Sequence, residues 1–343
     1  MEYRLLGRTG CVVSTLALGT MTFGTETSEP DSVAQLELYV EGGGNFIDTA
    51  DVYSGGVSEE IIGRWLKSKP VALREELVVA TKGRFPRGNG PNNRGLSRKH
   101  LDVALDASLQ RLQLDVIDLY QVHAFDALTP IEETLRFLDD AVRRGKIRYV
   151  GLSNFTAWQL QKAVDVATFR GLSVPVTLQP QYSLLVRELE WEIIPACASE
   201  GLGLLPWSPL GGGWLTGKYR RDERPTGTTR LGEGNRNGVE AFDRRNPQQR
   251  TWDVLDAVEE VATARGVSMA QVALSWLVDR PTVSSVILGA RTLAQLEDNL
   301  GAAALHLSEK ETARLDAASA PFTADYPYGE SGVNQRARAV ADS

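Results

Sequence analysis

The feature that most constrains the fold of this chain is a regular alternation of short apolar runs with longer segments of helical periodicity. Strands that alternate with helices in this way favour a parallel sheet. Eight such units predict an α/β fold of the (β/α)8 TIM-barrel type, with long loops at its carboxyl-terminal face. The eight predicted strands are residues 14–20, 45–50, 76–82, 116–123, 147–154, 175–182, 202–210 and 283–290.

The predicted helices follow these strands and carry ordinary signals at their ends. Ser28 and Asp31 are both candidate caps of the first helix, and glycines 42–44 predict its end. Pro130 is expected in a first turn, whereas Pro195 is expected to end or kink its helix. The predicted helices are residues 28–44, 58–68, 97–114, 129–146, 156–167, 188–201, 249–266, 268–280 and 293–304.

The alternating units account for nearly all of the chain, so residues 1–343 are expected to form a single barrel domain. A hairpin is expected at the start, from residues 3–10 into residues 11–14, with Gly10 in the turn.

Two segments interrupt the alternation. Residues 218–250 are rich in Arg, Gly and Asn, and they predict either a solvated loop or a lid over an anionic ligand. The tail at residues 320–343 is expected to fray at its end. The alternative is that its aromatic residues pack over a pocket: Phe322, Tyr326 and Tyr328.

Composition argues against several classes of protein. A net charge of −7 opposes non-specific binding to nucleic acid, which needs basic surface. Cys11 and Cys197 lie far apart and provide neither metal-ligand spacing nor a disulfide framework. The chain begins without the apolar core of a signal peptide, and no apolar run approaches the ~20 residues of a membrane span. We therefore expect a reduced, soluble, cytoplasmic protein.

Four polar residues carry the functional prediction: Asp48, Tyr53, Lys82 and His123. Three lie at or just past the downstream ends of predicted strands, and Tyr53 follows Asp48 in the next turn. Because parallel strands bring their carboxyl ends to one edge, we expect the four to lie together. Each residue alone is more often structural than catalytic, so the prediction depends on their shared placement.

Together the four side chains can make a proton donor for a carbonyl oxygen. A free phenol is a poor acid at neutral pH, with a pKa of about 10. The Lys82 ammonium can stabilise the phenolate of Tyr53, and Asp48 can hold Lys82 in place and protonated. A neutral His123 can then donate a second hydrogen bond to the same oxygen.

Other predicted strand ends carry groups suited to a ligand with an aromatic ring and a phosphate. Trp207 offers a face for stacking, or else lies in the core. Gly289 and Arg291 lie where the last predicted helix begins, a place that favours an anion, unless Arg291 is a surface residue. No G-x-G-x-x-G fingerprint supports a Rossmann site. Hydrogen-bonding side chains follow two further strands: Ser153, Asn154 and Gln179.

On these residues the chain resembles the aldo-keto reductase superfamily over essentially its whole length. The motif set is more similar to the bacterial and potassium-channel β-subunit-like members than to the vertebrate steroid reductases. The similar motifs, in family order, are LGTMTFG, FIDTADVYSGGVSEEIIGRWL, VVATK, LDVIDLYQVH, VGLSNF, LQPQYSLL, PWSPLGGGWLTGKY and ARTLAQLEDN.

The resemblance implies an NADP(H)-dependent oxidoreductase that reduces a small-molecule aldehyde or ketone to an alcohol by hydride transfer. Tyr53 would be the general acid, Lys82 and Asp48 its tuning pair, and His123 the residue that orients the carbonyl. The nicotinamide end of the cofactor would be held by Ser153, Asn154, Gln179 and Trp207.

The resemblance also implies where the rest of the cofactor binds. Thr20 and Met21 would lie beside it, and Asp48 would belong to the cofactor-binding residues as well. The pyrophosphate would be lined by Ser208, Leu210, Gly212, Lys218 and Arg230. The adenosine phosphate end would be held by Gly289, Arg291, Gln295, Asp298 and Asn299.

Two departures bear on the alternatives. The channel-subunit branch carries asparagine where this chain has His123, which favours a working reductase. Leu288 stands where many relatives have proline, next to the loop that leads to Arg291. The alternatives are a cofactor-sensing regulatory or binding subunit with little turnover, and a phosphate-binding lyase or isomerase on the same barrel. No metal, nucleic-acid or membrane partner is expected. Candidate pocket residues for an apolar or ring-bearing carbonyl, or a sugar, are Phe23, Phe85, Phe125 and Trp214.

Overall fold

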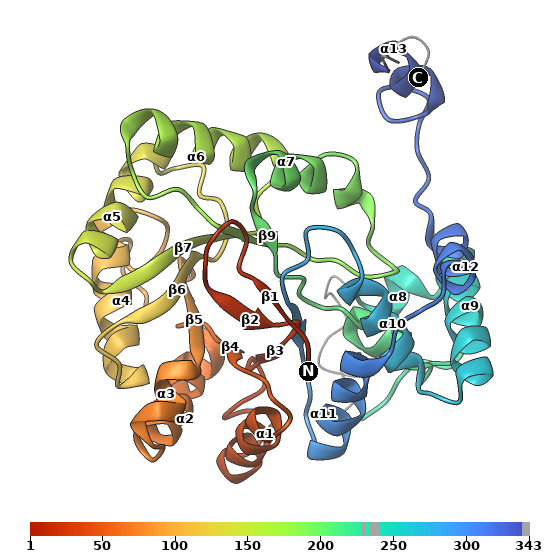
Figure 1. Cartoon of the computed structure of the whole chain (residues 1–343), viewed down its shortest axis with the longest axis horizontal. Coiled ribbons are helices and arrows are strands. Elements are labelled where there is room, and N and C mark those ends of the chain that lie inside the picture. The colour runs from red at the N-terminus through yellow and green to blue at the C-terminus, as the bar shows by residue number, and fades with distance from the viewer. Residues whose placement is uncertain (228–230, 233–239, 338–343) are drawn as a thin grey trace.

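The computed structural model describes residues 1–227, 231–232 and 240–337, and its centre is one parallel sheet (Figure 1). The eight strands run in the order β10-β3-β4-β5-β6-β7-β8-β9, so the last strand of the chain lies beside the first of the sheet. The strands are β3 (Leu16–Gly19), β4 (Phe46–Asp48), β5 (Val78–Gly83), β6 (Ile117–Val122), β7 (Ile147–Ser153), β8 (Thr177–Gln179), β9 (Gly203–Leu204) and β10 (Val286–Leu288).

The sheet curls until the segments at its two edges meet. The Leu204 amide of β9 donates to the Thr282 carbonyl oxygen at 2.8 Å, and the Ser284 amide donates to the Leu204 carbonyl oxygen at 2.9 Å. These bonds join β9 to the segment that leads into β10. Eight parallel strands with helices outside them are consistent with the predicted (β/α)8 fold.

The predicted N-terminal hairpin is confirmed. Strands β1 (Tyr3–Leu5) and β2 (Val12–Ser14) pair antiparallel, and the hairpin lies across the amino-terminal end of the sheet. Leu6 and Val13 are fully buried in one apolar cluster with strand residues such as Phe46 and Leu119. Because apolar side chains fill this end, polar chemistry is left to the carboxyl-terminal edge.

Helices surround the sheet, and every predicted helix has a counterpart (Figure 1). The helices are α1 (Glu29–Glu41), α2 (Val57–Lys67), α3 (Val71–Glu76), α4 (Arg98–Leu112), α5 (Ile131–Arg143), α6 (Ala157–Arg170), α7 (Ile193–Glu200), α8 (Phe242–Arg245), α9 (Gln249–Arg265), α10 (Met269–Val278), α11 (Leu293–Leu300), α12 (Glu309–Ser319) and α13 (Glu330–Arg336). Four short 3-10 helices are described as well: η1 (Tyr53–Gly56), η2 (Glu188–Glu190), η3 (Gly211–Thr216) and η4 (Gly301–Ala304).

The structure corrects several helix details. Ser28, not Asp31, caps α1, because its side chain accepts from the Asp31 amide at 3.3 Å. Pro195 neither ends nor kinks α7 but lies in its first turn, where a missing N–H costs no helical hydrogen bond. The helices α3, α8, α12 and α13 were not predicted. The prediction that residues 1–343 form one domain stays a prediction.

The two interrupting segments are partly buried where the structure describes them. In the 218–250 insert, Glu240 is buried and accepts a hydrogen bond from Gln181 Nε2 at 2.5 Å. The described part of the insert is therefore not wholly a solvated loop, and the alternative of a lid over an anionic ligand stays a prediction. In the tail, Phe322 and Tyr326 are exposed, so their prediction as pocket covers is wrong, whereas Tyr328 stacks on Trp191 with ring centroids 5.3 Å apart.

Within the described residues no single helix is long and apolar enough to cross a membrane. The one pair that is so in combination, α9 and α10, is bent by 100°.

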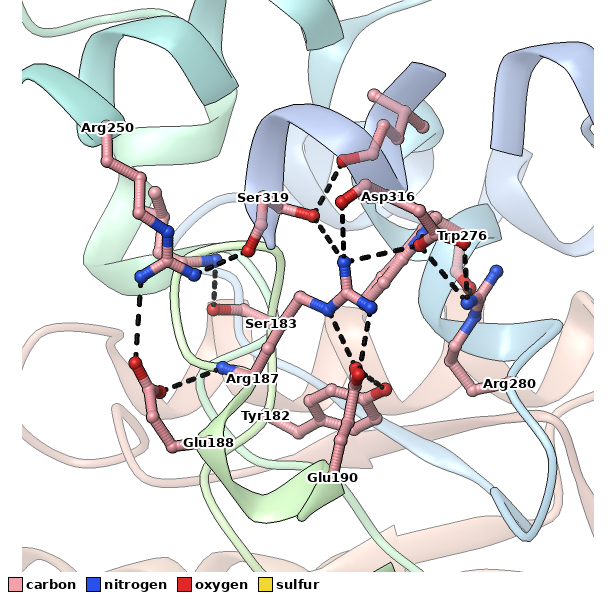
Figure 2. Close-up of polar contacts among 12 residues, drawn as sticks. Tyr182, Ser183, Arg187, Glu188, Glu190, Arg250, Trp276, Arg280, Asp316 and Ser319 are labelled. Atoms are coloured by element: carbon pink, nitrogen blue, oxygen red, sulfur yellow. Dashed lines mark hydrogen bonds and ion pairs between the residues drawn. The ribbon is translucent and has the colours of Figure 1, made fainter. Parts of the chain in front are cut away.

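A polar cluster around Arg187 ties the loop after β8 to the last helices of the fold, and Figure 2 shows Arg187 at its centre. The guanidinium donates to both carboxylate oxygens of Glu190 at 2.8 Å, and to Ser319 Oγ at 2.8 Å and the Asp316 carbonyl oxygen at 3.0 Å in α12. It also lies 5.3 Å from the ring of buried Trp276 in α10. One side chain thus fixes three segments that are distant in sequence.

We expect Arg187→Met to lower the free energy of unfolding by roughly 3 kcal/mol, because removing one partner of a largely buried ion pair leaves the other charge uncompensated. Denaturant titration would measure this. The matched control is Arg98→Met, since the Arg98 and Asp140 side chains are both 45% exposed and an ion pair of this kind is worth little. Equal losses in the two variants would contradict the role given to Arg187.

Candidate active site

The four predicted catalytic residues meet at the carboxyl-terminal edge of the sheet. Asp48 is the last residue of β4, Lys82 is the penultimate residue of β5, and His123 directly follows β6. Tyr53 begins η1, one turn after β4, and its side chain is half-buried. Parallel pairing places the ends of neighbouring strands side by side. The four residues therefore lie together at one edge of the sheet, as the sequence predicts.

Lys82 connects the group. Its ammonium donates to Asp48 Oδ2 at 2.6 Å, to the Thr49 carbonyl oxygen at 2.7 Å and to Tyr53 Oη at 3.3 Å. The side chains of Lys82 and Asp48 are 0% and 2% exposed. All three protons of the ammonium therefore have oxygen partners, and a cation lies against the phenol oxygen.

The electrostatic environment fixes the charge of Lys82 and His123. Burial alone would lower the pKa of Lys82, but the Asp48 carboxylate and, in addition, Tyr53 raise it above its ordinary value. Burial and the positive charges of Lys82 and Arg84 lower the pKa of His123 to about 2. At neutral pH the site thus holds an ammonium and a neutral imidazole.

His123 lies between two aromatic rings. Its ring centroid is 6.0 Å from that of Tyr53 and 4.6 Å from that of Phe85, both edge-on. Among the described residues, its buried Nδ1 has no hydrogen-bond partner. The rings of Tyr53 and His123 therefore lie next to each other at this edge of the sheet.

Gln121 is a site residue that the sequence prediction missed. Its Nε2 donates to Asp48 Oδ1 at 3.1 Å, and Gln179 Nε2 donates to the same oxygen at 2.9 Å. Gln121 pairs with Lys82 in the register of β5 and β6, so it presents its side chain on the same face. It lies within the predicted strand 116–123 rather than at its end. The prediction considered only polar residues at strand ends, so it did not include Gln121.

The predicted amide-binding residues form a connected chain. Ser153 Oγ donates to the Gln179 carbonyl oxygen at 3.0 Å, and Asn154 Nδ2 donates to the His123 carbonyl oxygen at 2.9 Å. Trp207 Nε1 donates to Asn154 Oδ1 at 3.1 Å, which fixes a half-exposed indole over this edge. Asn154 has a φ of 54°, a strained conformation of the kind found at functional sites.

The segment after β9 forms a tight turn of three glycines. Gly211, Gly212 and Gly213 have φ values of 57°, 65° and 95°, which residues with a Cβ rarely adopt. A Cβ on Gly213 would lie 2.5 Å from Lys218 Nζ, so the lysine lies directly over the glycine turn. Ser208 and Leu210 lie just before this turn and are half-buried.

The residues after β10 are gathered at the start of α11. Arg291 forms an ion pair with Glu26, and its amide donates to Gln295 Oε1 at 2.9 Å. Asn299 Nδ2 donates to the Gly289 carbonyl oxygen at 3.4 Å. The carboxylate of Asp298 points elsewhere, because it accepts from Ser268 and Gln271 at 2.8 and 2.9 Å.

The remaining predicted residues divide into three groups. Thr20 is buried and donates to the Asp48 carbonyl oxygen at 3.1 Å, and Met21 beside it is 43% exposed. Arg230 lies outside the described residues. Phe23 and Trp214 are fully buried in the core, so their prediction as pocket residues is wrong, whereas Phe85 and Phe125 are half-buried.

Comparison with known proteins gives concordant matches. The family model described as "Aldo/keto reductase family" matches residues 15–320. The chain is 39% identical to "Uncharacterized oxidoreductase YrpG" of Bacillus subtilis, over 92% of this chain and 94% of that protein. It is 38% identical to "Probable voltage-gated potassium channel subunit beta" of Oryza sativa (88% and 91%). It is 34% identical to "Versiconal hemiacetal acetate reductase" of Aspergillus parasiticus (92% and 96%).

We expect the His123 ring to stay neutral from pH 8 down to about pH 4, because its pKa is lowered to about 2. NMR of protein labelled with ¹⁵N-histidine would measure the ring nitrogens, and His123→Asn would identify its signals. A His123 signal that titrates between pH 5 and pH 7 would contradict the burial and charge argument.

Proposed function

The chain belongs to the aldo/keto reductase family, and we propose from the geometry of its site that it reduces an aldehyde or ketone to an alcohol with NADPH as hydride donor. The observation that carries the proposal is the contact of the Lys82 ammonium with the Tyr53 phenol at 3.3 Å, beside the neutral imidazole of His123. The substrate would be a small-molecule carbonyl compound, and a cytoplasmic location stays a prediction.

Tyr53 would donate the proton that the carbonyl oxygen takes up. Lys82 lies against the phenol oxygen and would stabilise the phenolate that remains after the transfer. Its own charge is secured by Asp48, which accepts from it at 2.6 Å. Asp48 and Lys82 therefore act through Tyr53, which is the one of these three that would touch the substrate.

His123 would hold the carbonyl oxygen in position. A neutral imidazole can donate one hydrogen bond without adding a second positive charge beside Lys82. The ring of Phe85, 4.6 Å from His123, limits where the carbonyl can lie and helps to exclude water. This arrangement supports an oxygen bound between Tyr53 and His123.

The residues at the sheet edge fit NADPH, which when bound would supply the hydride. Ser153, Asn154 and Gln179 offer a fixed set of amide and hydroxyl groups for the carboxamide, and Trp207 offers an indole held by Asn154 for stacking. Lys218, whose ammonium lies over the glycine turn at 211–213, offers a positive charge for the pyrophosphate. Further contacts are proposed from Thr20, Met21, Ser208, Leu210, Gly289, Arg291, Gln295 and Asn299, and from Asp298 and Arg230 by family resemblance alone.

A cofactor-sensing subunit is the second candidate, and one observation favours it: the 38% identity to a protein named as a probable potassium channel subunit. The contact of Lys82 with Tyr53 and the presence of His123 favour turnover instead. Tight NADPH binding with no turnover of any compound in a broad carbonyl panel would favour the sensing subunit.

We expect Tyr53→Phe to lower kcat/KM for aldehyde reduction by about 10²–10⁴-fold, the usual contribution of a positioned acid. NADPH oxidation would be followed by absorbance, and NADPH binding should be unchanged. The matched control is Tyr149→Phe, since Tyr149 lies in the amino-terminal half of β7, away from the site. Unchanged reduction by Tyr53→Phe would show that the proton donor is another group.

We expect Arg291→Ala to raise the KM for NADPH by about tenfold or more, because one charge-assisted hydrogen bond to phosphate is worth roughly 1.5–3 kcal/mol. The KM for NADH, which lacks that phosphate, should change little. Arg314→Ala, on the exposed side of α12, is the control. A similar rise for both nucleotides would contradict selection of NADP(H) by Arg291.

A further inference from the structure

Asp51 is a buried acidic residue two positions before Tyr53, and the chemistry described above does not use it. Its side chain is fully buried, whereas the side chain of Tyr53 is half-exposed. Among the described residues, neither carboxyl oxygen of Asp51 accepts a hydrogen bond of normal geometry. The Val52 amide interacts with the carboxyl group only weakly. A carboxylate buried in this way is costly, because nothing replaces the water that it loses.

The surroundings of Asp51 lie on the outer face of the sheet, behind Lys82. Glu59 of α2 is fully buried and accepts from Thr81 Oγ1 at 2.6 Å and from Arg111 Nε at 2.7 Å. Tyr120 of β6 is also fully buried, and among the described residues its hydroxyl has no hydrogen-bond partner. The hydroxyl oxygen of Tyr120 packs against Gly83, the residue after Lys82. A Cβ atom added to Gly83 would lie only 2.3 Å from that oxygen.

The charges around Asp51 favour its neutral form. Burial and the negative charge of Glu59 raise the pKa of Asp51 to about 7, and the more weakly acting Arg87 and Arg111 oppose this. The charge of Glu59 is already balanced by Arg111, with which it forms an ion pair at 2.7 Å. Asp51 therefore lies in a site that holds a carboxylic acid more readily than a carboxylate.

The backbone links Asp51 to both Lys82 and Tyr53. The Asp51 amide donates to the Lys82 carbonyl oxygen at 3.1 Å, and the Tyr53 amide donates to the Ala50 carbonyl oxygen at 3.1 Å. The turn then passes through Ser54, a residue with a φ of 50° whose hydroxyl donates to the Phe23 carbonyl oxygen. Asp51 and Ser54 thus anchor the turn that carries Tyr53 on its two sides.

We propose that Asp51 is a positioning residue: its backbone amide anchors the Tyr53 turn, its buried carboxyl group is tolerated there as a neutral acid, and its ionisation shifts Tyr53 away from Lys82. The proposal rests on the proposed function only where turnover is concerned. An ionised Asp51 would face the carboxylate of Glu59 and the phenol of Tyr120. The charges of Arg87 and Arg111 act on it more weakly, so the repulsion would displace the turn. The contact of Lys82 with Tyr53, already 3.3 Å long, would be the first to lengthen.

The test compares wild type with Asp51→Asn, which keeps the shape of the side chain but cannot ionise. A single ionisation near pH 7 that inactivates Tyr53 predicts about a tenfold fall in kcat between pH 6 and pH 8 in wild type. In Asp51→Asn this fall in kcat between pH 6 and pH 8 should be absent, and kcat at pH 6 should equal that of wild type. Asp102→Asn, a half-exposed carboxylate paired with Arg144, is the control and should leave the profile unchanged.

Two readouts do not depend on turnover. The first is the ¹³C-labelled ring signal of Tyr53, identified with Tyr53→Phe, which should move with a midpoint near pH 7 in wild type and lose that midpoint in Asp51→Asn. The second is the Tm. When the pKa of a carboxyl group is higher in the folded than in the unfolded protein, the free energy of unfolding falls as the pH rises and is lowest above the folded-state pKa. The Tm of Asp51→Asn should therefore exceed that of wild type by several degrees at pH 8, with a difference that shrinks toward pH 4.

The outcomes separate the two proposals. A wild-type protein that reduces no carbonyl compound would overturn the proposed function, while the Tyr53 signal and the Tm would still decide the role of Asp51. The role of Asp51 is overturned if the Tyr53 signal has the same pH dependence in wild type and Asp51→Asn. It is also overturned if Asp51→Asn lowers kcat equally at every pH, the result expected of a merely structural residue.

Discussion

The ion pair between Lys82 and Asp48 is the interaction on which the rest of the site depends. Both charges are removed from water, and such a pair is stable only when further hydrogen bonds satisfy its remaining donors and acceptors. The Thr49 carbonyl oxygen and Tyr53 accept the remaining hydrogen bonds of the Lys82 ammonium. Gln121 and Gln179 donate hydrogen bonds to the Asp48 carboxylate. Side chains from β4, β5, β6 and β8 and from the turn after β4 are thereby fixed around one ion pair, and Tyr53 is the member that reaches toward solvent.

The fold separates this polar site from its apolar support. The hairpin and the apolar cluster that includes Phe46 and Leu119 fill the amino-terminal end of the sheet, and the carboxyl-terminal edge carries the ion pair. Parallel register makes this possible, because Lys82 pairs with Gln121 and Ser153 pairs with Gln179, so side chains on neighbouring strands share a face. The Arg187 cluster then secures the loop after β8, the strand that Gln179 ends, against α10 and α12 (Figure 2).

Two buried networks thus lie on opposite faces of the same strand. Lys82 points inward to Asp48, while Thr81 before it bonds Glu59 on the outer face and Gly83 after it gives room to Tyr120. Consecutive side chains along a strand point to opposite faces of the sheet. The inner site around Lys82 and the outer acidic cluster around Glu59 are therefore connected by the backbone of β5 rather than by its side chains. The Tyr53 turn crosses from one to the other, which gives it two sets of anchors.

The sequence by itself determined the order of strands and helices, the hairpin, and the identity of the three polar residues at strand ends and of Tyr53 in the next turn, because periodicity and local end signals are properties of neighbouring residues. It did not predict the role of Gln121 in mid-strand, the first-turn position of Pro195, or the burial of Phe23 and Trp214, since these depend on register and on which distant segment packs against them. Only the tertiary structure decided that the Asp48 carboxylate receives two side-chain amide donors and that, among the residues the structure describes, the Asp51 carboxyl group receives no side-chain donor. The physical reason is that hydrogen-bond partners and exposure to water are set by segments far apart in the chain, which only folding brings together.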